Sequence, residues 1–297
     1  MKTAFVKCAL VSAAAALVAG VFLNMDTRQI MKAEAAAMSE RSYEVEKLNI
    51  PQDAVRLVIV EADGLSANVS MYVKTNTNTD PDAAAEEAVC TWMEAVSTDE
   101  GLIGRKGMGK TVEGDEKTPV GLYKMNTPFG TEAAQEGFPA NYLQVDSRYY
   151  WNGDSDSDRY NQLVNTDTYN NFNKAKSEHL ATYGGIAYHY CIDTGYNIEG
   201  TPRRGSALFL HCSAGKNTAG CIAIPETPMV EIMKGYVEGG TYILLDTKGN
   251  FAQYYRQETD TKADVPADVN PETAASQGEL SSEDVKKGPC VLSGSCE

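Results

Sequence analysis

The chain has 297 residues and a formal net charge of −15, with 42% hydrophobic and 23% charged residues. This composition is that of a globular protein with enough apolar material for a sizeable core. So negative a chain does not bind nucleic acid or anionic lipid through a general electrostatic field. An anionic partner would have to be held by local contacts.

The first 37 residues have the organisation of an export signal. Lys2 and Lys7 precede an uncharged apolar run over residues 8–23, and residues 33–37 offer small-residue cleavage positions. The run is shorter than the ~20 residues that a membrane-spanning helix needs. An uncleaved N-terminal anchor is the alternative, and both interpretations place the body of the protein outside the cytoplasm. Loss of residues 1–37 removes four basic and two acidic side chains and leaves a net charge of −17.

The rest of the chain divides by composition into three parts. Residues 38–56 are polar and are expected to form a spacer, and residues 57–257 carry the apolar patterns of a folded domain. Residues 258–297 are acidic, rich in Pro and Ser, and poor in large apolar side chains. Such a tail cannot bury enough surface to offset its ordering entropy, so we expect it to be disordered.

Within the domain, strand patterns outnumber helical ones. Strands are expected at residues 57–60, 70–73, 89–96, 185–192, 207–212 and 242–245. One helix is expected over 228–237, with Thr227 as its N-cap, because apolar residues recur there at spacings of three and four. The polar segment 151–183 is expected to hold one or two short helices. This order predicts a mainly β domain with a few short helices.

Two polar features of the chain resemble known ligand sites without matching them. The acidic run at 154–158 lacks the central glycine and the bidentate glutamate of a calcium loop, so it is expected to be a solvated loop. The glycine-rich hairpin over 101–121 carries Lys106, Lys110 and Lys117, but not at the spacing of a phosphate-binding loop. We expect these lysines to be solvated.

The residues most informative about chemistry lie between 207 and 225. An apolar strand ends at His211, a flexible loop follows, and the chain returns through Thr218-Ala219-Gly220-Cys221 into a second apolar strand. A thiol attacks a carbonyl as the thiolate, so it needs a base such as imidazole and N–H donors for the oxyanion. His211 and Cys221 are therefore the candidate base and nucleophile, and the N–H groups of Gly220 and Cys221 are candidate oxyanion donors.

Two upstream stretches complete this pattern: Gly109-Lys110-Thr111 and Thr118-Pro119-Val120-Gly121-Leu122-Tyr123. In this order, the three motifs resemble the L,D-transpeptidase (YkuD-type) catalytic domain, over roughly residues 57–246. The resemblance implies a β-barrel or β-sandwich fold and a cysteine acyl-enzyme. It also implies a peptidoglycan stem peptide as donor, cleaved between its diamino acid and terminal D-alanine. The acyl group then passes to an amine, or to water in a carboxypeptidase. Neither a metal nor an organic cofactor is implied.

Four residues match the family's signature: the nucleophile Cys221, the base His211, Gly220 and Thr218. Thr218 is therefore a candidate contact to substrate. The family commonly has His where this chain has Ala219, and Arg or Asn where it has Ala223, and its loop is commonly longer. The resemblance therefore does not extend to stem and acceptor specificity.

The supporting residues are less constrained by the pattern. The imidazole of His211 could be oriented by the Ser213 hydroxyl, the Cys212 carbonyl or Asp193, of which we take Ser213 as the candidate. Three further side chains are candidates for contacts to substrate: Tyr188, Tyr190 and Arg203.

Other interpretations of the same residues remain open. Cys221 could be half of a structural disulfide, and Cys191 and Cys212 could pair between neighbouring strands. His189, Cys191, His211, Cys212 and Cys221 could form a zinc site, although the usual ligand spacings are missing. The departures beside Cys221 also suit a catalytically silent protein that binds the cell wall.

Overall fold

The computed structural model describes residues 41–76, 90–183 and 185–257. The predicted export segment 1–37 and tail 258–297 lie outside these residues. The described chain forms a mixed ten-stranded sheet in the order β4-β13-β1-β2-β3-β12-β11-β10-β5-β6, and a three-stranded sheet in the order β8-β7-β9. The expected mainly β fold is confirmed.

The larger sheet contains, in chain order, β1 (Arg56–Asp63), β2 (Ser66–Asn76), β3 (Cys90–Leu102), β4 (Gly121–Lys124), β5 (Pro128–Gly130), β6 (Leu143–Gln144), β10 (Cys191–Asp193), β11 (Phe209–Cys212), β12 (Ile222–Ile224) and β13 (Thr241–Thr247). The smaller sheet contains β7 (Tyr149–Trp151), β8 (Leu163–Asn165) and β9 (Glu178–His179). The helices are short: α2 (Leu180–Tyr183), α3 (Glu226–Gly235), and the 3₁₀ turns η2 (Val45–Lys47), η4 (Lys174–Lys176), η5 (Gly185–Tyr188) and η6 (Phe251–Tyr254).

The larger sheet curls into two halves that face each other. β3 joins the halves, pairing along its length with β2 and through Leu102 with Ala223 of β12. β4 and β6 stand at the two ends of the strand order. In the described part of the chain no ladder joins these two end strands, so the structure shows an open, curled mixed sheet.

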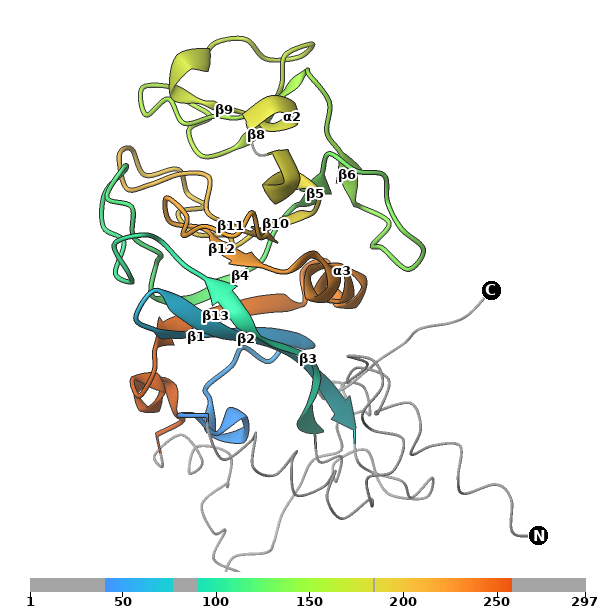
Figure 1. Cartoon of the computed structure of the whole chain (residues 1–297), viewed down its shortest axis with the longest axis vertical. Coiled ribbons are helices and arrows are strands. Elements are labelled where there is room, and N and C mark those ends of the chain that lie inside the picture. The colour runs from blue at the N-terminus through green and yellow to red at the C-terminus, as the bar shows by residue number, and fades with distance from the viewer. Residues whose placement is uncertain (1–40, 77–89, 184, 258–297) are drawn as a thin grey trace, which may run out of the picture.

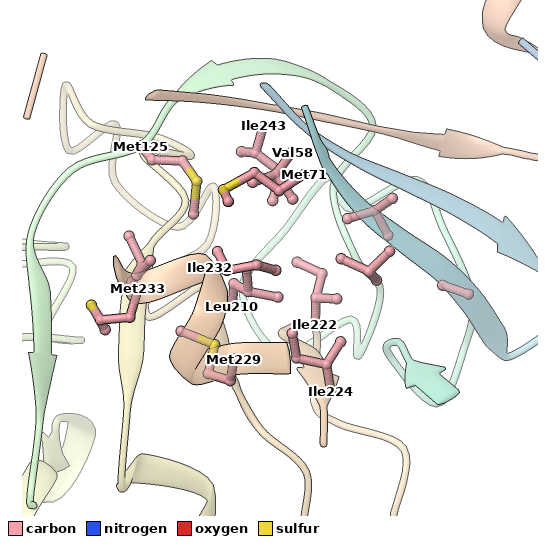
Figure 2. Close-up of a cluster of buried hydrophobic side chains, with 14 of the residues drawn as sticks. Val58, Met71, Met125, Leu210, Ile222, Ile224, Met229, Ile232, Met233 and Ile243 are labelled. Carbon is pink, nitrogen blue, oxygen red and sulfur yellow. The ribbon is translucent and has the colours of Figure 1, made fainter. Parts of the chain in front are cut away.

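The strands β1, β10, β11, β12 and β13 are buried on both faces, and the period-two alternation of their side chains sorts the core into layers. In β1, Val58 and Val60 point into the space between the two halves, whereas Leu57 and Ile59 point to the opposite face. Figure 2 shows the inner layer, where Val58 and Ile243 approach the side chains of α3 and of β11–β12. This packing fixes which face of each strand is available for a site.

α3 seals the inner layer beside β11 and β12 (Figure 1). Its apolar side chains Met229, Ile232 and Met233 are fully buried, as the spacing of three and four predicts. The helix begins at Glu226, two residues earlier than expected, because Pro225 rather than Thr227 is the N-cap. Among the described residues, no helix has the length and hydropathy needed to cross a membrane.

The described part of the predicted spacer, residues 41–56, packs against the domain instead of standing apart from it. Tyr43 and Leu48 are buried in the outer layer of the first half, beside Phe251. The side chain of Arg41 forms an ion pair with Glu94. This polar segment is thus attached to the domain mainly by its few apolar residues, with the Arg41 ion pair in addition.

Three other expectations are corrected by the structure. The strand expected at 89–96 extends to Leu102 as β3, and most of its side chains between Met93 and Glu100 are exposed. The strand expected at 185–192 begins only at Cys191, because residues 185–188 form the turn η5. The segment 151–183 contains the smaller sheet in addition to two short helical turns. In its acidic run, Asp154 is buried and accepts hydrogen bonds from Asn173 N and Lys176 Nζ.

Candidate active site

His211 and Cys221 lie on the same face of two adjacent parallel strands. β11 and β12 pair with Leu210 opposite Ile222 and His211 opposite Ala223, so Cys221 falls beside Phe209, two positions behind His211. With strands about 4.8 Å apart and a rise of ~3.3 Å per residue, the two Cα atoms are roughly 8 Å apart, within reach of the two side chains. Both side chains line one cavity of about 310 Å³.

Cys221 is buried at the floor of this cavity. Its Sγ donates to the carbonyl oxygen of Ala207 at 3.1 Å and accepts from the N–H of Phe209 at 3.3 Å. Burial, with a smaller contribution from the charge of Glu178, raises the pKa of the thiol to about 12, and the Phe209 N–H and Lys110 act in the opposite direction. The resting group is therefore a neutral thiol beside one donor and one cation that favour the thiolate.

His211 is held by its Nδ1 atom, which lies 2.8 Å from the carbonyl oxygen of Cys212. Because a carbonyl oxygen only accepts, Nδ1 carries the proton, and Nε2 is the nitrogen that can take one up. Burial lowers the pKa of His211 to about 4, so the resting imidazole is neutral. A neutral thiol and a neutral imidazole with basic Nε2 are suited to proton transfer during attack on a carbonyl.

The cysteine turn is tied to the upstream hairpin by two threonines. The hydroxyl of Thr118 donates to the carbonyl oxygen of Gly220 at 2.8 Å and accepts from the N–H of Gly104. The hydroxyl of Thr218 donates to the carbonyl oxygen of Cys221 and accepts from the N–H of Gly220 at 3.0 Å. The motifs at 118–123 and 218–221 are therefore parts of one structural unit.

These contacts bear on two expectations about the turn. Thr218 lines the cavity, but its hydroxyl is engaged in holding the turn. The N–H of Gly220 is used by Thr218, so it is not a free oxyanion donor. Gly220 is required for another reason: its φ is +147°, and a Cβ there would lie 2.8 Å from the carbonyl oxygen of Lys117.

Lys110 is buried against the cavity wall, contrary to the expectation of a solvated lysine. Its Nζ pairs with Asp115 at 2.9 Å, and its side chain is 2% exposed. Although burial alone raises the pKa of Asp115, N–H donors and Lys110 together hold it well below its usual range. The Asp115 carboxylate therefore stays ionised and holds the Lys110 side chain at the wall of the Cys221 cavity.

Tyr188 also lines the cavity, from η5, and its ring meets the His211 ring edge-on at 5.8 Å between centroids. Its hydroxyl donates to Oε2 of Glu178, a residue that sequence analysis did not single out. Burial raises the pKa of Glu178 to about 7. Only the fold brings Glu178 here, since it is 43 positions from Cys221 on a strand of the smaller sheet.

Three predicted site residues take other places. Tyr190 packs in the inner layer, where its hydroxyl accepts from Gln135, on the opposite face of the sheet from Cys221. The hydroxyl of Ser213 accepts from the N–H of Gly215, so the Cys212 carbonyl, not Ser213, orients His211. Arg203 is exposed and is not among the residues that line the cavity.

The structure also bears on the disulfide and the zinc site that the sequence left open. Cys191 and Cys221 belong to one buried cluster, together with Phe129 and Phe209, whereas Cys212 lies in the inner layer. Cys191 and Cys212 are both free thiols. Adjacent strands thus carry Cys191 and Cys212 on opposite faces, which prevents the suggested disulfide. His189 contacts Glu226 and is not part of the cavity lining. Within the ranges that the structure describes, no three His, Cys, Asp or Glu side chains are grouped to hold a metal.

A second cavity, of about 610 Å³, lies between β4, residues 195–199 and Tyr236. It is larger than the Cys221 cavity, but its lining contains neither cysteine nor histidine. The chemistry that the sequence points to is therefore confined to the smaller cavity.

Comparison with known proteins gives a distant structural likeness. No family model matches the chain, and no curated protein matches it in sequence. The helical cell shape determining protein Pgp2 from Campylobacter jejuni aligns with a TM-score of 0.37 and 15% identity, over 73% of this chain and 55% of that one. Bd1075 from Bdellovibrio bacteriovorus aligns with a TM-score of 0.34 and 12% identity, over 67% and 50%. The chain thus spans about half the length of these two proteins.

Proposed function

We propose that this protein is a cysteine acyltransferase of the L,D-transpeptidase type that acts on peptidoglycan stem peptides. The observation that carries the proposal is the placement of Cys221 and His211 on one face of adjacent strands, with Nδ1 of His211 bound to the Cys212 carbonyl. The resemblance of the three sequence motifs supplies the substrate class. Action on the cell wall requires export, which agrees with the predicted signal in residues 1–37.

The proposed reaction has two steps. The thiol of Cys221 attacks the carbonyl carbon of the diamino acid while its proton passes to Nε2 of His211. The tetrahedral intermediate then expels terminal D-alanine, whose amine receives that proton, and a thioester remains on Cys221. In the second step a neutral amine of another stem attacks the thioester and gives a proton to Nε2 of His211; the imidazole passes this proton to the departing sulfur of Cys221, and an amide cross-link forms.

Because both groups are neutral at rest, proton transfer has to accompany attack. A preformed thiolate–imidazolium pair would require the buried thiol, with its pKa of about 12, to ionise before substrate binds. The N–H of Phe209 and the cation of Lys110 offset part of the negative charge as it forms on sulfur.

Purified protein incubated with disaccharide-tetrapeptide provides the test, with mass spectrometry of both the protein and the products. We expect an acyl adduct on Cys221, release of D-alanine and, with an amine acceptor, a cross-linked dimer. His211→Ala should slow adduct formation by several orders of magnitude, because the thiol loses its base. Release of D-alanine with hydrolysis alone would identify an L,D-carboxypeptidase. Absence of any adduct, with no D-alanine released, would contradict the proposal and leave binding of the cell wall without catalysis as the alternative to test.

A further inference from the structure

Two carboxylates in the Cys221 cavity have no role in the acyl transfer described above. Glu178 reaches the cavity from β9 of the smaller sheet, and Glu113 reaches it from the glycine-rich hairpin. They come from segments more than sixty positions apart, yet both line the space in front of Cys221. A site that only moved a proton between thiol and imidazole would gain nothing from them, since the charge of Glu178 disfavours the thiolate.

Both carboxylates are fixed by hydroxyl groups. The hydroxyl of Tyr188 donates a hydrogen bond to Oε2 of Glu178. Oε2 of Glu113 accepts hydrogen bonds from the hydroxyl of Tyr160 and from that of Ser206, the latter at 2.9 Å. Among the described residues, the hydrogen bonds to these two side chains all end on Oε2. Oε1 of each carboxylate therefore keeps its capacity to accept a hydrogen bond from a ligand.

The two carboxylates lack a cationic partner within the described chain. The cavity lining contains three cations, of which Arg105 pairs with Glu116 at 3.2 Å and Lys110 pairs with Asp115 at 2.9 Å. The third, Lys216, is exposed on the loop between β11 and β12. Burial, and to a lesser extent the charge of Glu113, raises the pKa of Glu178. A cation bound between the two groups would relieve both effects.

We propose that Glu113 and Glu178 bind a protonated primary amine of the substrate and so select stem peptides that carry a free side-chain amine on the diamino acid. This inference rests on the proposed function, since it names a recognition element of the same cavity. An ammonium group has three donors, enough to reach Oε1 of both carboxylates and one further acceptor. The amine belongs either to the donor stem or to the acceptor stem.

Two tetrapeptides that differ only by acetylation of the side-chain amine provide the test. Acylation of Cys221 is followed without acceptor for wild type, Glu178→Gln and Glu113→Gln, with Glu231→Gln on the exposed face of α3 as the matched control. If the donor amine is bound, acetylation should lower kcat/KM of wild type and control at least tenfold. In the two cavity variants the two peptides should react at closely similar rates. For the acceptor amine, transfer to the free-amine acceptor is measured in the same four proteins, because acetylation of the acceptor would remove the nucleophile itself; if the acidic pair binds this amine, the KM for acceptor should rise at least tenfold in the two cavity variants alone.

The outcomes separate this inference from the proposed function. Discrimination against the acetylated donor that is lost in the cavity variants assigns the acidic pair to the donor stem, and a raised acceptor KM in those variants without donor discrimination assigns it to the acceptor. Equal rates for the two donor peptides together with an unchanged acceptor KM in the cavity variants, with Cys221 acylated normally, would overturn the inference alone. If no acylation occurs, the proposed function fails, and calorimetric binding of the two peptides to Cys221→Ala still tests the amine site. Equal affinities there would overturn it.

Discussion

The hydroxyl of Thr118 donates a hydrogen bond to the carbonyl oxygen of Gly220 at 2.8 Å, across 102 positions of sequence. The same oxygen atom of Thr118 accepts from the N–H of Gly104. One fully buried hydroxyl thus joins the glycine-rich hairpin to the turn that presents Cys221. The position of the thiol therefore depends on a residue that does not line its cavity.

Thr118→Val should weaken both stability and activity. Valine preserves the shape of threonine but leaves the Gly220 carbonyl and the Gly104 N–H without their partner, at a cost of about 1–3 kcal/mol. Thr241→Val provides the comparison, because it removes a buried hydroxyl bonded to Val237 outside the cavity. Urea unfolding should show similar losses for the two variants, whereas only Thr118→Val should slow acylation of Cys221. Equal acylation rates would mean that the hairpin does not position the turn.

Gly220→Ala should displace the nucleophile. A φ of +147° is strained for alanine, and the new Cβ would lie 2.8 Å from the carbonyl oxygen of Lys117. We expect a loss of stability of about 1–3 kcal/mol together with a large loss of acylation. Gly215→Ala shares the positive φ but has no atom within 4 Å of the new Cβ. That control should show strain without loss of the acyl adduct, and a similar adduct yield in both variants would count against this geometry.

Cys221→Ala should eliminate the acyl adduct and leave the fold intact. Removing one buried sulfur should cost about 1 kcal/mol of stability. The control is Cys212→Ala, since Cys212 points into the inner layer and its Sγ donates to the Tyr190 carbonyl. Intact-mass measurement after incubation with tetrapeptide should find the adduct on the control alone. An adduct on Cys221→Ala would place the nucleophile elsewhere.

His211 should make the protein less stable in acid. Burial lowers its pKa from 6.5 to about 4, so between these values the unfolded chain binds a proton that the folded protein does not. The stability associated with His211 is therefore complete above pH 6.5 and is lost as pH falls toward 4, by on the order of 3 kcal/mol. His211→Gln should remove this dependence in urea unfolding curves measured above and below that window.

The pH dependence of wild type has to be compared with that of His211→Gln, because two buried carboxyl groups change the stability with pH in the opposite direction to His211. Burial raises the pKa values of Glu178 and Asp193 to about 7, so their contribution is present at low pH and is lost as pH rises through that value. Wild type and variant share both carboxyl groups. Parallel pH profiles for the two proteins would show that His211 is not held neutral by the fold.

Local patterns predicted the parts of the fold that are buried on both faces. β1, β11 and β13 read as apolar runs, and the strand residues around His211 and Cys221 followed from the same runs. Patterns failed where polar side chains alternate on an exposed strand, as in the second half of β3. They also failed at η5, where a 3₁₀ turn replaces the expected strand and so separates Tyr188, which reaches the cavity, from Tyr190, which does not.

The candidate site divides in the same way. His211 and Cys221 are ten positions apart and carry a recognisable motif, so sequence alone suggested them. Lys110 lay within a motif, but its burial depends on the Asp115 contact and on the packing of Gly205 against its side chain. Glu178 belongs to no motif. Its place in the cavity arises from the position of the smaller sheet, which no local pattern encodes.

That smaller sheet lies beside the larger one (Figure 1). Aromatic rings join the two, with the ring of Trp151 against that of Phe209 at 4.7 Å between centroids. His211 belongs to β11 and Cys221 directly precedes β12, while Glu178 belongs to a segment that the main sheet could lose without breaking a strand ladder. The proposed chemistry and one half of the proposed amine site are thus encoded in separable stretches of the gene, with Glu113 remaining in the hairpin. Exchange of residues 146–183 between homologues should therefore alter peptide preference while leaving Cys221 and His211 in place.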